Sequence, residues 1–192
     1  MFSTLILGIE SSCDETAAAL VRNGREVLAQ TVASQHELHA KFGGVVPEIA
    51  SRAHIERIGP TLSQTLQAAG IGPEQLDAVA VGHRPGLIGS LLVGLSAAKT
   101  LSWAWDKPLI GVDHVLAHLH AGALNGEPIR YPALGLVVSG GHSSLYGLDG
   151  PLSARRLGRT IDDAIGEAYD KVAALLGLGF PGGPAVDRAA AE

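Results

Sequence analysis

Three histidines stand close together in the segment DHVLAHLHAG at 113–122, and the first two, His114 and His118, are four residues apart. In an α-helix this spacing places two side chains one turn apart on the same face, so both imidazoles can bind one metal ion. Imidazole nitrogen is a common ligand of iron and zinc. Solvated or capped helix positions can show the same spacing, so the pair alone leaves both interpretations open.

Two other segments combine serine hydroxyls with glycine or an acid between apolar runs: GIESSCDET at 8–16 and VSGGHSS at 138–144. Each is expected to be the turn of a hairpin, where backbone N–H groups and hydroxyls can converge on a phosphate or carboxylate. Either segment alone is more typical of an ordinary turn, because glycine is common in turns. Their matching places in two similar units favour a nucleotide site formed by two lobes.

Further glycine-containing segments are weaker candidates. The start of an expected helix at 86–90 has unpaired N–H groups that favour anions. The loop FPGGP at 180–184 lets the backbone approach a ribose or adenine, although by itself it indicates only a loop. Gly94 and Ala97 are expected to serve close helix packing.

Composition restricts the class of protein. The chain has 192 residues, of which 46% are hydrophobic and 17% charged, as expected for a globular protein. Its net charge of −5 lacks the basic footprint of a free-standing nucleic-acid binder, so a local basic patch or a partner would have to supply the charge for RNA. The single cysteine, Cys13, excludes an internal disulfide and is expected to be a small packed side chain. No signal peptide or membrane span is recognisable, so we expect a cytoplasmic protein.

Hydrophobic periodicity predicts the elements that position these residues. Three antiparallel strands come first, with the dipeptide Asn23-Gly24 as a hairpin turn between the second and third. A helix, a strand, a second helix, a strand and the histidine helix follow, which is the order of a ribonuclease-H-like lobe. The ranges expected before the histidine helix are 3–10, 16–23, 25–34, about 48–69, 76–82, about 87–105 and 108–113.

The pattern restarts near Tyr131, as expected for a structural repeat. Strand, glycine turn and strand at 133–150 precede a third strand at 153–161 and a helix from about 162 to 176. We therefore expect two domains. Residues 1–125 are the first lobe, including the histidine helix, and residues 126–192 are the start of a second, incomplete lobe that binds nucleotide.

Six segments together resemble, in order, the threonylcarbamoyl transferase family TsaD, formerly called O-sialoglycoprotein endopeptidase or glycoprotease. The resemblance covers essentially the whole chain and implies an α/β, ASKHA (actin-like, sugar-kinase-like, Hsp70-like) fold of two ribonuclease-H-like lobes, the first complete and the second truncated. The segments are GIESSCDET, GGVVPEIASRAHIERI, PGLIGSLLVGLSAAKTL, HVLAHLHA, VSGGHSSLY and DDAIGEAYDKVAALLGLGFPGGPAVD.

The resemblance also implies an activity. The family transfers threonylcarbamoyl from threonylcarbamoyl-AMP to N6 of the adenosine next to the anticodon, position 37, in tRNAs that read ANN codons. Its implied partners are tRNA, a TsaB-like paralogue, a small ATPase and a threonylcarbamoyl-AMP synthase. Its implied cofactor is one divalent metal, usually Fe²⁺ and sometimes zinc, which matches His114 and His118 here and takes a further aspartate from the second lobe.

The family's nucleotide-binding positions also have counterparts in this chain. Five belong to the adenylate loop, one aspartate contacts the ribose, and a glycine and a second aspartate face the nucleotide. In this order they match Val138, Ser139, Gly140, Gly141, His142, Asp170, Gly183 and Asp187.

Three departures from the family pattern stand out. Leu116 replaces the glutamate of the usual H-x-E-x-H, which removes a support of the metal site and leaves the histidines in place. His83 and Arg84 precede Pro85, whereas the family usually has GPGL at this place, so the segment before the expected helix is bulkier and cationic here. The later asparagine and metal-binding aspartate are absent from these 192 residues, so weak metal binding is expected unless Asp113 or His142 completes the site.

Three alternative functions remain. A TsaB-like scaffold would lack the metal histidines, a metalloprotease would carry H-E-x-x-H, and a sugar or acetate kinase of the same fold would need a carboxylate base. His114 and His118 argue against the scaffold. Four other histidines are expected not to bind the metal: His36, His39, His54 and His120.

Overall fold

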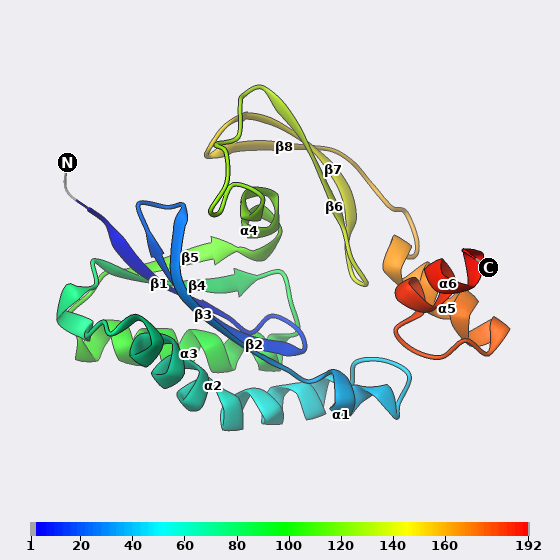
Figure 1. The fold of residues 1–192 in the computed structure, drawn as a ribbon, viewed down its shortest axis with the longest axis horizontal. Helices are drawn as coiled ribbons and strands as arrows, with labels where there is room; N and C mark the ends of the chain where they lie inside the picture. Colours follow the sequence, from blue (N-terminus) through cyan, green and yellow to red (C-terminus); the bar gives the residue numbers. More distant parts are fainter. Residues whose placement is uncertain (1–2, 192) are drawn as a thin grey trace. The chain divides into compact units, whose positions relative to one another are not determined.

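The computed structural model describes residues 3–191. It divides into two compact units (Figure 1). The N-terminal unit consists of the described residues of Met1–His39 with Val45–Glu127, and the C-terminal unit consists of Ala40–Gly44 with the described residues of Pro128–Glu192. That residues 1–125 and 126–192 are two lobes of one fold stays a prediction.

A five-stranded sheet forms the centre of the N-terminal unit, in the order β3-β2-β1-β4-β5. The first three strands pair antiparallel, and β4 and β5 extend the sheet in parallel with β1. The strands are β1 (Leu5–Glu10), β2 (Glu15–Arg22), β3 (Glu26–Ser34), β4 (Ala78–Arg84) and β5 (Leu109–Asp113). Asn23 and Gly24 both have positive φ, 53° and 70°, as the predicted hairpin turn requires.

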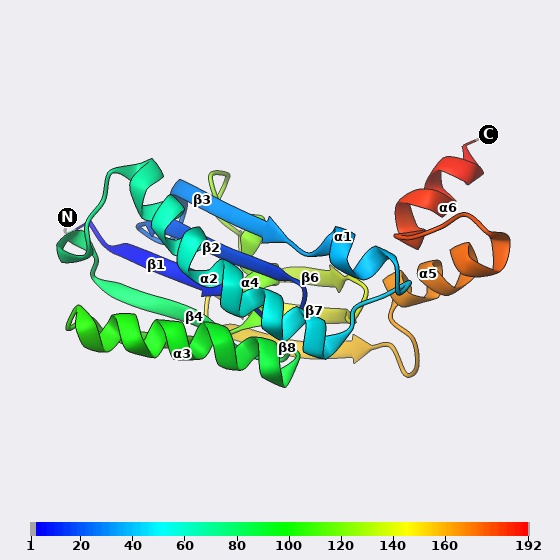
Figure 2. The same cartoon turned by 90° about the horizontal axis from the view of Figure 1, so that it is seen from below.

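Helices cover both faces of this sheet. The helix α2 (Pro47–Ala69) and the helix α3 (Ile88–Ala104) pack on one face, and α4 (His114–Ala121) lies on the other (Figures 1 and 2). Leu7, Ile9 and Leu20 are buried between the sheet and α2 and α3, because alternate strand residues point to one face. The short α1 (His36–Ala40) and a 3-10 turn at Pro73–Gln75 were not predicted.

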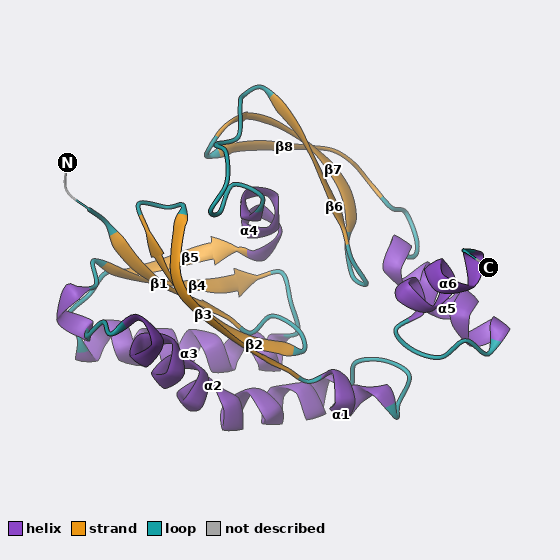
Figure 3. Cartoon of the chain, in the orientation of Figure 1, coloured by secondary structure: helices purple, strands orange, loops and turns teal. Residues whose placement is uncertain are grey.

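The C-terminal unit has a three-stranded antiparallel sheet, β6-β7-β8, followed by two helices that pack on each other (Figure 3). Its elements are β6 (Ala133–Val138), β7 (Ser143–Gly150), β8 (Ser153–Arg159), α5 (Ile165–Leu176) and α6 (Gly182–Ala190). The predicted strand–turn–strand–strand–helix order is confirmed. The helix begins three residues later than the predicted start at 162, because the first N–H groups of α5 are held by the turn before β7.

The α/β class and the ribonuclease-H-like strand order are confirmed. Among residues 3–191, no helix is long and apolar enough to cross a membrane.

Candidate functional site

The two histidines predicted to bind metal face each other at the start of α4. Their Nε2 atoms are 3.1 Å apart, and their rings are nearly perpendicular, at 82°. Two imidazole nitrogens bound to one ion at about 2.0–2.1 Å lie roughly 2.8–3.4 Å apart, from octahedral to tetrahedral geometry. The spacing of His114 and His118 therefore fits two ligands of one metal ion.

The start of α4 is fixed by its N-cap. Asp113 Oδ1 accepts hydrogen bonds from the backbone N–H groups of Val115, at 3.0 Å, and Leu116, at 3.3 Å. The other oxygen, Oδ2, lies 3.5 Å from Arg84 Nε. Both oxygens of Asp113 are thus engaged away from the histidine nitrogens, and no group of three metal-ligating side chains occurs among the described residues.

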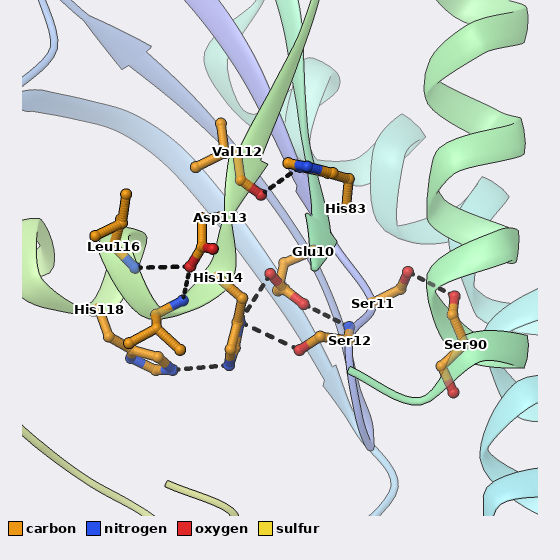
Figure 4. Close-up of polar contacts among 11 residues, drawn as sticks. Glu10, Ser11, Ser12, His83, Ser90, Val112, Asp113, His114, Leu116 and His118 are labelled. Atoms are coloured by element: carbon orange, nitrogen blue, oxygen red, sulfur yellow. Dashed lines mark hydrogen bonds and ion pairs between the residues drawn. The ribbon is translucent and has the colours of Figure 1, made fainter. Parts of the chain in front are cut away.

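The carboxylate of Glu10, at the end of β1, supports His114. Glu10 Oε2 accepts from His114 Nδ1 at 3.1 Å, and Oε1 accepts from the backbone N–H of Ser12 (Figure 4). Because Nδ1 carries the shared proton, Nε2 of His114 is left to bind a metal. A hydrogen-bonded carboxylate behind a histidine is the usual support of a metal ligand.

Charge and hydrogen bonding reinforce this pair. Burial alone would raise the pKa of Glu10, but hydrogen bonds from His114 and Ser12 and the charge of His114 outweigh it, so the pKa of Glu10 is lowered. The hydrogen bond to Glu10 raises the pKa of His114 despite its partial burial. Sequence reasoning missed Glu10. Its signal was an acid at the end of a buried strand, on the same sheet edge as His114.

The first serine turn is occupied by contacts within its own unit. Ser12 Oγ lies 3.2 Å from His114 Nδ1, and Ser11 Oγ donates to the carbonyl of Ser90 at 2.8 Å and accepts from Gly94 N–H at 3.1 Å. Leu87 N–H donates to the carbonyl of Ser12 at 2.8 Å. These bonds anchor the turn to the start of α3, so its serines hold the histidine site in place.

Glycines give this arrangement the room it needs. A Cβ atom on Gly82 would lie 2.5 Å from Glu10 Oε2, and one on Gly86 would lie 2.6 Å from the carbonyl oxygen of Ser12. The structural role predicted for Gly94 is confirmed, since a Cβ there would collide with Ser11.

A cavity of about 530 Å³ opens beside the histidines, within the N-terminal unit. Glu10, Gln30, His114 and His118 are its polar lining residues, and apolar or small residues of the five strands, of α4 and of the segment after α4 form the rest. Its volume lies in the range of small-ligand sites.

Two of the histidines expected to be non-ligands, His39 and His54, are buried. His54 Nε2 donates to the carbonyl of Cys13 at 3.0 Å and its Nδ1 accepts from Thr16 Oγ1 at 2.7 Å, while burial lowers its pKa. His39 Nε2 donates to Gln35 Oε1 at 3.1 Å. Both side chains are held by hydrogen bonds within the N-terminal unit.

The prediction that Cys13 is a packed side chain is wrong, because this residue is exposed. Desolvation, followed by the charge of Asp14 and other acids, raises the pKa of its thiol to about 12. The thiol therefore stays protonated at neutral pH and is a poor nucleophile.

The second glycine turn closes on itself and on α5. Ser139 N–H donates to the carbonyl of His142 at 2.7 Å, and His142 N–H donates to Ser139 Oγ at 3.0 Å. Gly166 N–H donates to the carbonyl of Ser139 at 3.2 Å. Ile165 N–H donates to Ser143 Oγ at 2.8 Å. The turn thus satisfies the first N–H groups of α5, which have no partner inside the helix.

The remaining predicted nucleotide positions lie along α5 and α6. Asp170 is one turn after Gly166 on the same face of α5, and its Oδ1 accepts from Gly182 N–H at 2.6 Å, which joins it to the start of α6. A side chain on Gly183 would meet no protein atom within 4 Å, so a ligand can approach there. Asp187 is exposed on α6. In the C-terminal unit, the turn therefore lies at the start of α5, Asp170 lies on α5, and Gly183 lies at the start of α6.

The unusual entrance residues also have structural partners. His83 Nδ1 donates to the carbonyl of Val112 at 3.0 Å, and Arg84 pairs with the cap Asp113. The register between β4 and β5 shifts at this point, and both side chains are exposed. They connect β4 to the segment that begins the histidine helix.

Comparison with known sequences gives consistent matches. A sequence model of the family TsaD, described as tRNA N6-adenosine threonylcarbamoyltransferase, matches residues 26–192. The protein of that name from Symbiobacterium thermophilum is 60% identical over 186 residues, 97% of this chain and 54% of the relative. The one from Staphylococcus carnosus is 54% identical over 189 residues, 98% of this chain and 55% of the relative. The chain thus spans about half the length of these curated relatives.

A solved structure shares the fold. YeaZ from Pseudomonas aeruginosa superimposes with a TM-score of 0.53 at 21% identity, over 81% of this chain and 65% of that chain. The chain therefore shares its fold with this protein, as the predicted α/β class requires. With a family match over most of its residues and relatives at 54–60% identity, the chain belongs to the tRNA N6-adenosine threonylcarbamoyltransferase family.

Proposed function

We propose that this chain carries the metal-binding histidines and the adenylate-binding turn of a tRNA threonylcarbamoyl transferase. The reaction moves threonylcarbamoyl from threonylcarbamoyl-AMP to N6 of adenosine 37 in tRNAs that read ANN codons, with AMP as the leaving group. The observation that carries the proposal is the facing pair of His114 and His118, supported by Glu10. Family membership supplies the reaction class.

The proposed metal is Fe²⁺, with zinc as the second choice, since both accept imidazole. When bound, the metal supplies Lewis-acid polarisation of the carbamoyl carbonyl or grips the carboxylate and phosphate oxygens of the substrate. The chain's own contribution is to aim two nitrogens at one point. Glu10 keeps the proton of His114 on Nδ1, and the Asp113 cap fixes the helix that carries both rings.

The adenylate is proposed to lie against the turn Val138–His142, with its ribose at Asp170 and its remaining contacts at Gly183 and Asp187. Open space at Gly141 and Gly183 supports this, because neither position is filled by protein atoms. The substrate is already activated as an adenylate, so N6 of adenosine can attack it directly. A nucleophilic thiol is not needed, in agreement with the raised pKa of Cys13.

The proposed partners are tRNA, a TsaB-like paralogue, a small ATPase and the synthase that makes threonylcarbamoyl-AMP, all in the cytoplasm. Exposed apolar side chains on α2 and α3 support a protein partner at these helices. These helices touch where a Cβ on Gly89 would meet Ser51, and Ile55, Ile88 and Leu92 lie exposed around this contact. We name these three side chains the α2/α3 apolar patch.

Metal titration tests the histidine assignment. Anaerobic calorimetry with Fe²⁺ and with Zn²⁺ should show weak binding of one ion to the 192-residue chain, lost in His114→Ala and in His118→Ala. The matched control is His120→Ala, which changes a histidine on the same helix and should bind as the parent does. Equal metal binding by all four proteins would contradict the proposal and favour the alternative of a non-catalytic scaffold.

A further inference from the structure

Three arginines lie on the edge strand β8 of an otherwise acidic chain. Arg155, Arg156 and Arg159 are exposed, and β8 pairs only with β7. Residues 128–161 contain four arginines and one aspartate, a net charge of +3, whereas the other residues carry −8 of the total of −5. We call Arg155, Arg156 and Arg159 the β8 arginine strip.

The cations of the strip have no acidic partner, whereas several exposed cations elsewhere in the described residues do. Arg22 pairs with Glu26, Arg52 with Glu48, and Lys171 with Asp163 and Glu167. None of the three strip arginines forms an ion pair with any residue in the range 3–191. Their charge is therefore available to an external anion.

A β-bulge directs two of these side chains to one face. Arg156 lies opposite Tyr146 and Arg159 lies opposite Ser144, while the register shift between these pairs leaves one extra residue on β8. In a regular strand, residues three apart point to opposite faces. The bulge instead places Arg156 and Arg159 on the same face as Tyr146, an arrangement of two guanidinium groups beside an aromatic ring.

The strip leads to the glycine turn within the same unit. Arg159 is opposite Ser144, and the next N–H along the chain, of Thr160, donates to the carbonyl of Ser143 at 2.9 Å. Ser143 directly follows the turn residue His142. An anionic polymer bound along β8 would thus run toward the turn proposed to hold the adenylate.

We propose that the β8 arginine strip binds the phosphate backbone of the tRNA substrate. Guanidinium groups bind phosphates in bidentate fashion, and an adjacent aromatic ring offers a stacking surface for an unpaired base. Such contacts position RNA without reading its sequence. The naming of tRNA rests on the proposed function, whereas a polyanion on β8 follows from the charges and their geometry.

The test is tRNA binding by the 192-residue chain, measured by fluorescence anisotropy with a labelled transcript that has an ANN-reading anticodon. The double variant Arg156→Gln/Arg159→Gln should bind about tenfold more weakly at low salt, and its slope of log Kd against log salt should fall by about 1.4–1.8. Arg156→Lys/Arg159→Lys should keep most of the slope. Arg22→Gln/Arg52→Gln removes the same charge from paired arginines and should bind as the parent chain does.

Equal affinity and equal slope for the parent and the glutamine variant would overturn the proposal. So would displacement of the tRNA by poly-L-glutamate at equal concentration of negative charge, since that would indicate an acidic protein partner. Transfer of threonylcarbamoyl, measured with the partners present, separates this proposal from the function. Strip-dependent tRNA binding without transfer would support the strip alone, and transfer with strip-independent binding would overturn the strip alone.

Discussion

The carboxylate of Glu10 connects three parts of the N-terminal unit. It closes the serine turn through Ser12, holds the Nδ1 proton of His114, and occupies the space left free by Gly82. The family's usual glutamate inside the histidine motif is replaced here by Leu116, which is partly exposed and cannot hydrogen-bond to a ring. Support for His114 therefore comes from β1 and not from α4.

Replacement of Glu10 should weaken metal binding without removing a ligand. Glu10→Gln keeps the size of the side chain but loses the charge that holds the Nδ1 proton, so the affinity for Zn²⁺ should fall by about 10- to 100-fold. Competition with a chromophoric chelator measures this. The control Glu15→Gln changes an exposed acid at the start of β2 and should have no effect. If Glu10→Gln kept the parent's affinity for Zn²⁺ and its unfolding transition, the role of Glu10 would be only to anchor the serine turn.

At the scale of elements, α5 organises the C-terminal unit. Its first turn is held by the carbonyl of Ser139, and the close approach requires glycine at 166, where a Cβ would lie 2.7 Å from Gly140 N. One turn later, Asp170 holds the start of α6. The turn, the helix and the following loop are therefore one connected structure.

Two glycine variants should separate ligand contact from packing. A Cβ on Gly141 meets nothing within 4 Å, so Gly141→Val should keep the melting temperature and reduce the affinity for AMP by blocking the ligand. Gly166→Val should reduce both, because the new side chain must push α5 off the turn and costs about 1–3 kcal/mol. Calorimetry with AMP and thermal unfolding measure the two effects. Undiminished AMP binding by Gly141→Val would contradict the assignment of the turn.

At the scale of the whole molecule, the proposed metal site and the proposed nucleotide site belong to different units. The histidine pair and its supports lie in the N-terminal unit, and the glycine turn, Asp170 and the β8 arginine strip lie in the C-terminal unit. The positive charge that overall composition did not reveal lies on residues 128–161 of the second unit, which carry a net charge of +3. The α2/α3 apolar patch belongs to the first, whose helices α2 and α3 lie on the face of the sheet opposite α4 (Figure 1).

Disruption of the α2/α3 apolar patch should weaken association with the proposed TsaB-like partner. Ile88→Asp/Leu92→Asp places charges in the centre of the patch, and the Kd should rise by about 30-fold or more, as for other buried interface residues. Trp103→Asp is the control, because Trp103 is 86% exposed on the same helix and lies about three turns from Leu92. Size-exclusion chromatography and calorimetry measure association, and equal Kd values for both variants would place the interface elsewhere.

Much of the fold followed from the order of residues. The buried alternation of Leu5, Leu7 and Ile9, the Asn23-Gly24 turn, and Pro47 at the start of α2 are local signals, and each produced the predicted element. The pairing of His114 with His118 was also local, because helix geometry alone brings residues four apart together. The short α1 was not predicted, since five residues give too little periodicity.

The sequence by itself determined the family, the strand order of each unit and the two histidines, because these depend on motifs and on spacings within one element. Only the tertiary structure showed that Glu10 supports His114, that both oxygens of Asp113 are engaged, and that Gly166 packs on the turn. Glu10 and His114 are 104 residues apart, and they meet because parallel strands β1, β4 and β5 end at the same edge of the sheet. Contacts of this kind depend on strand register and burial, which no local pattern contains.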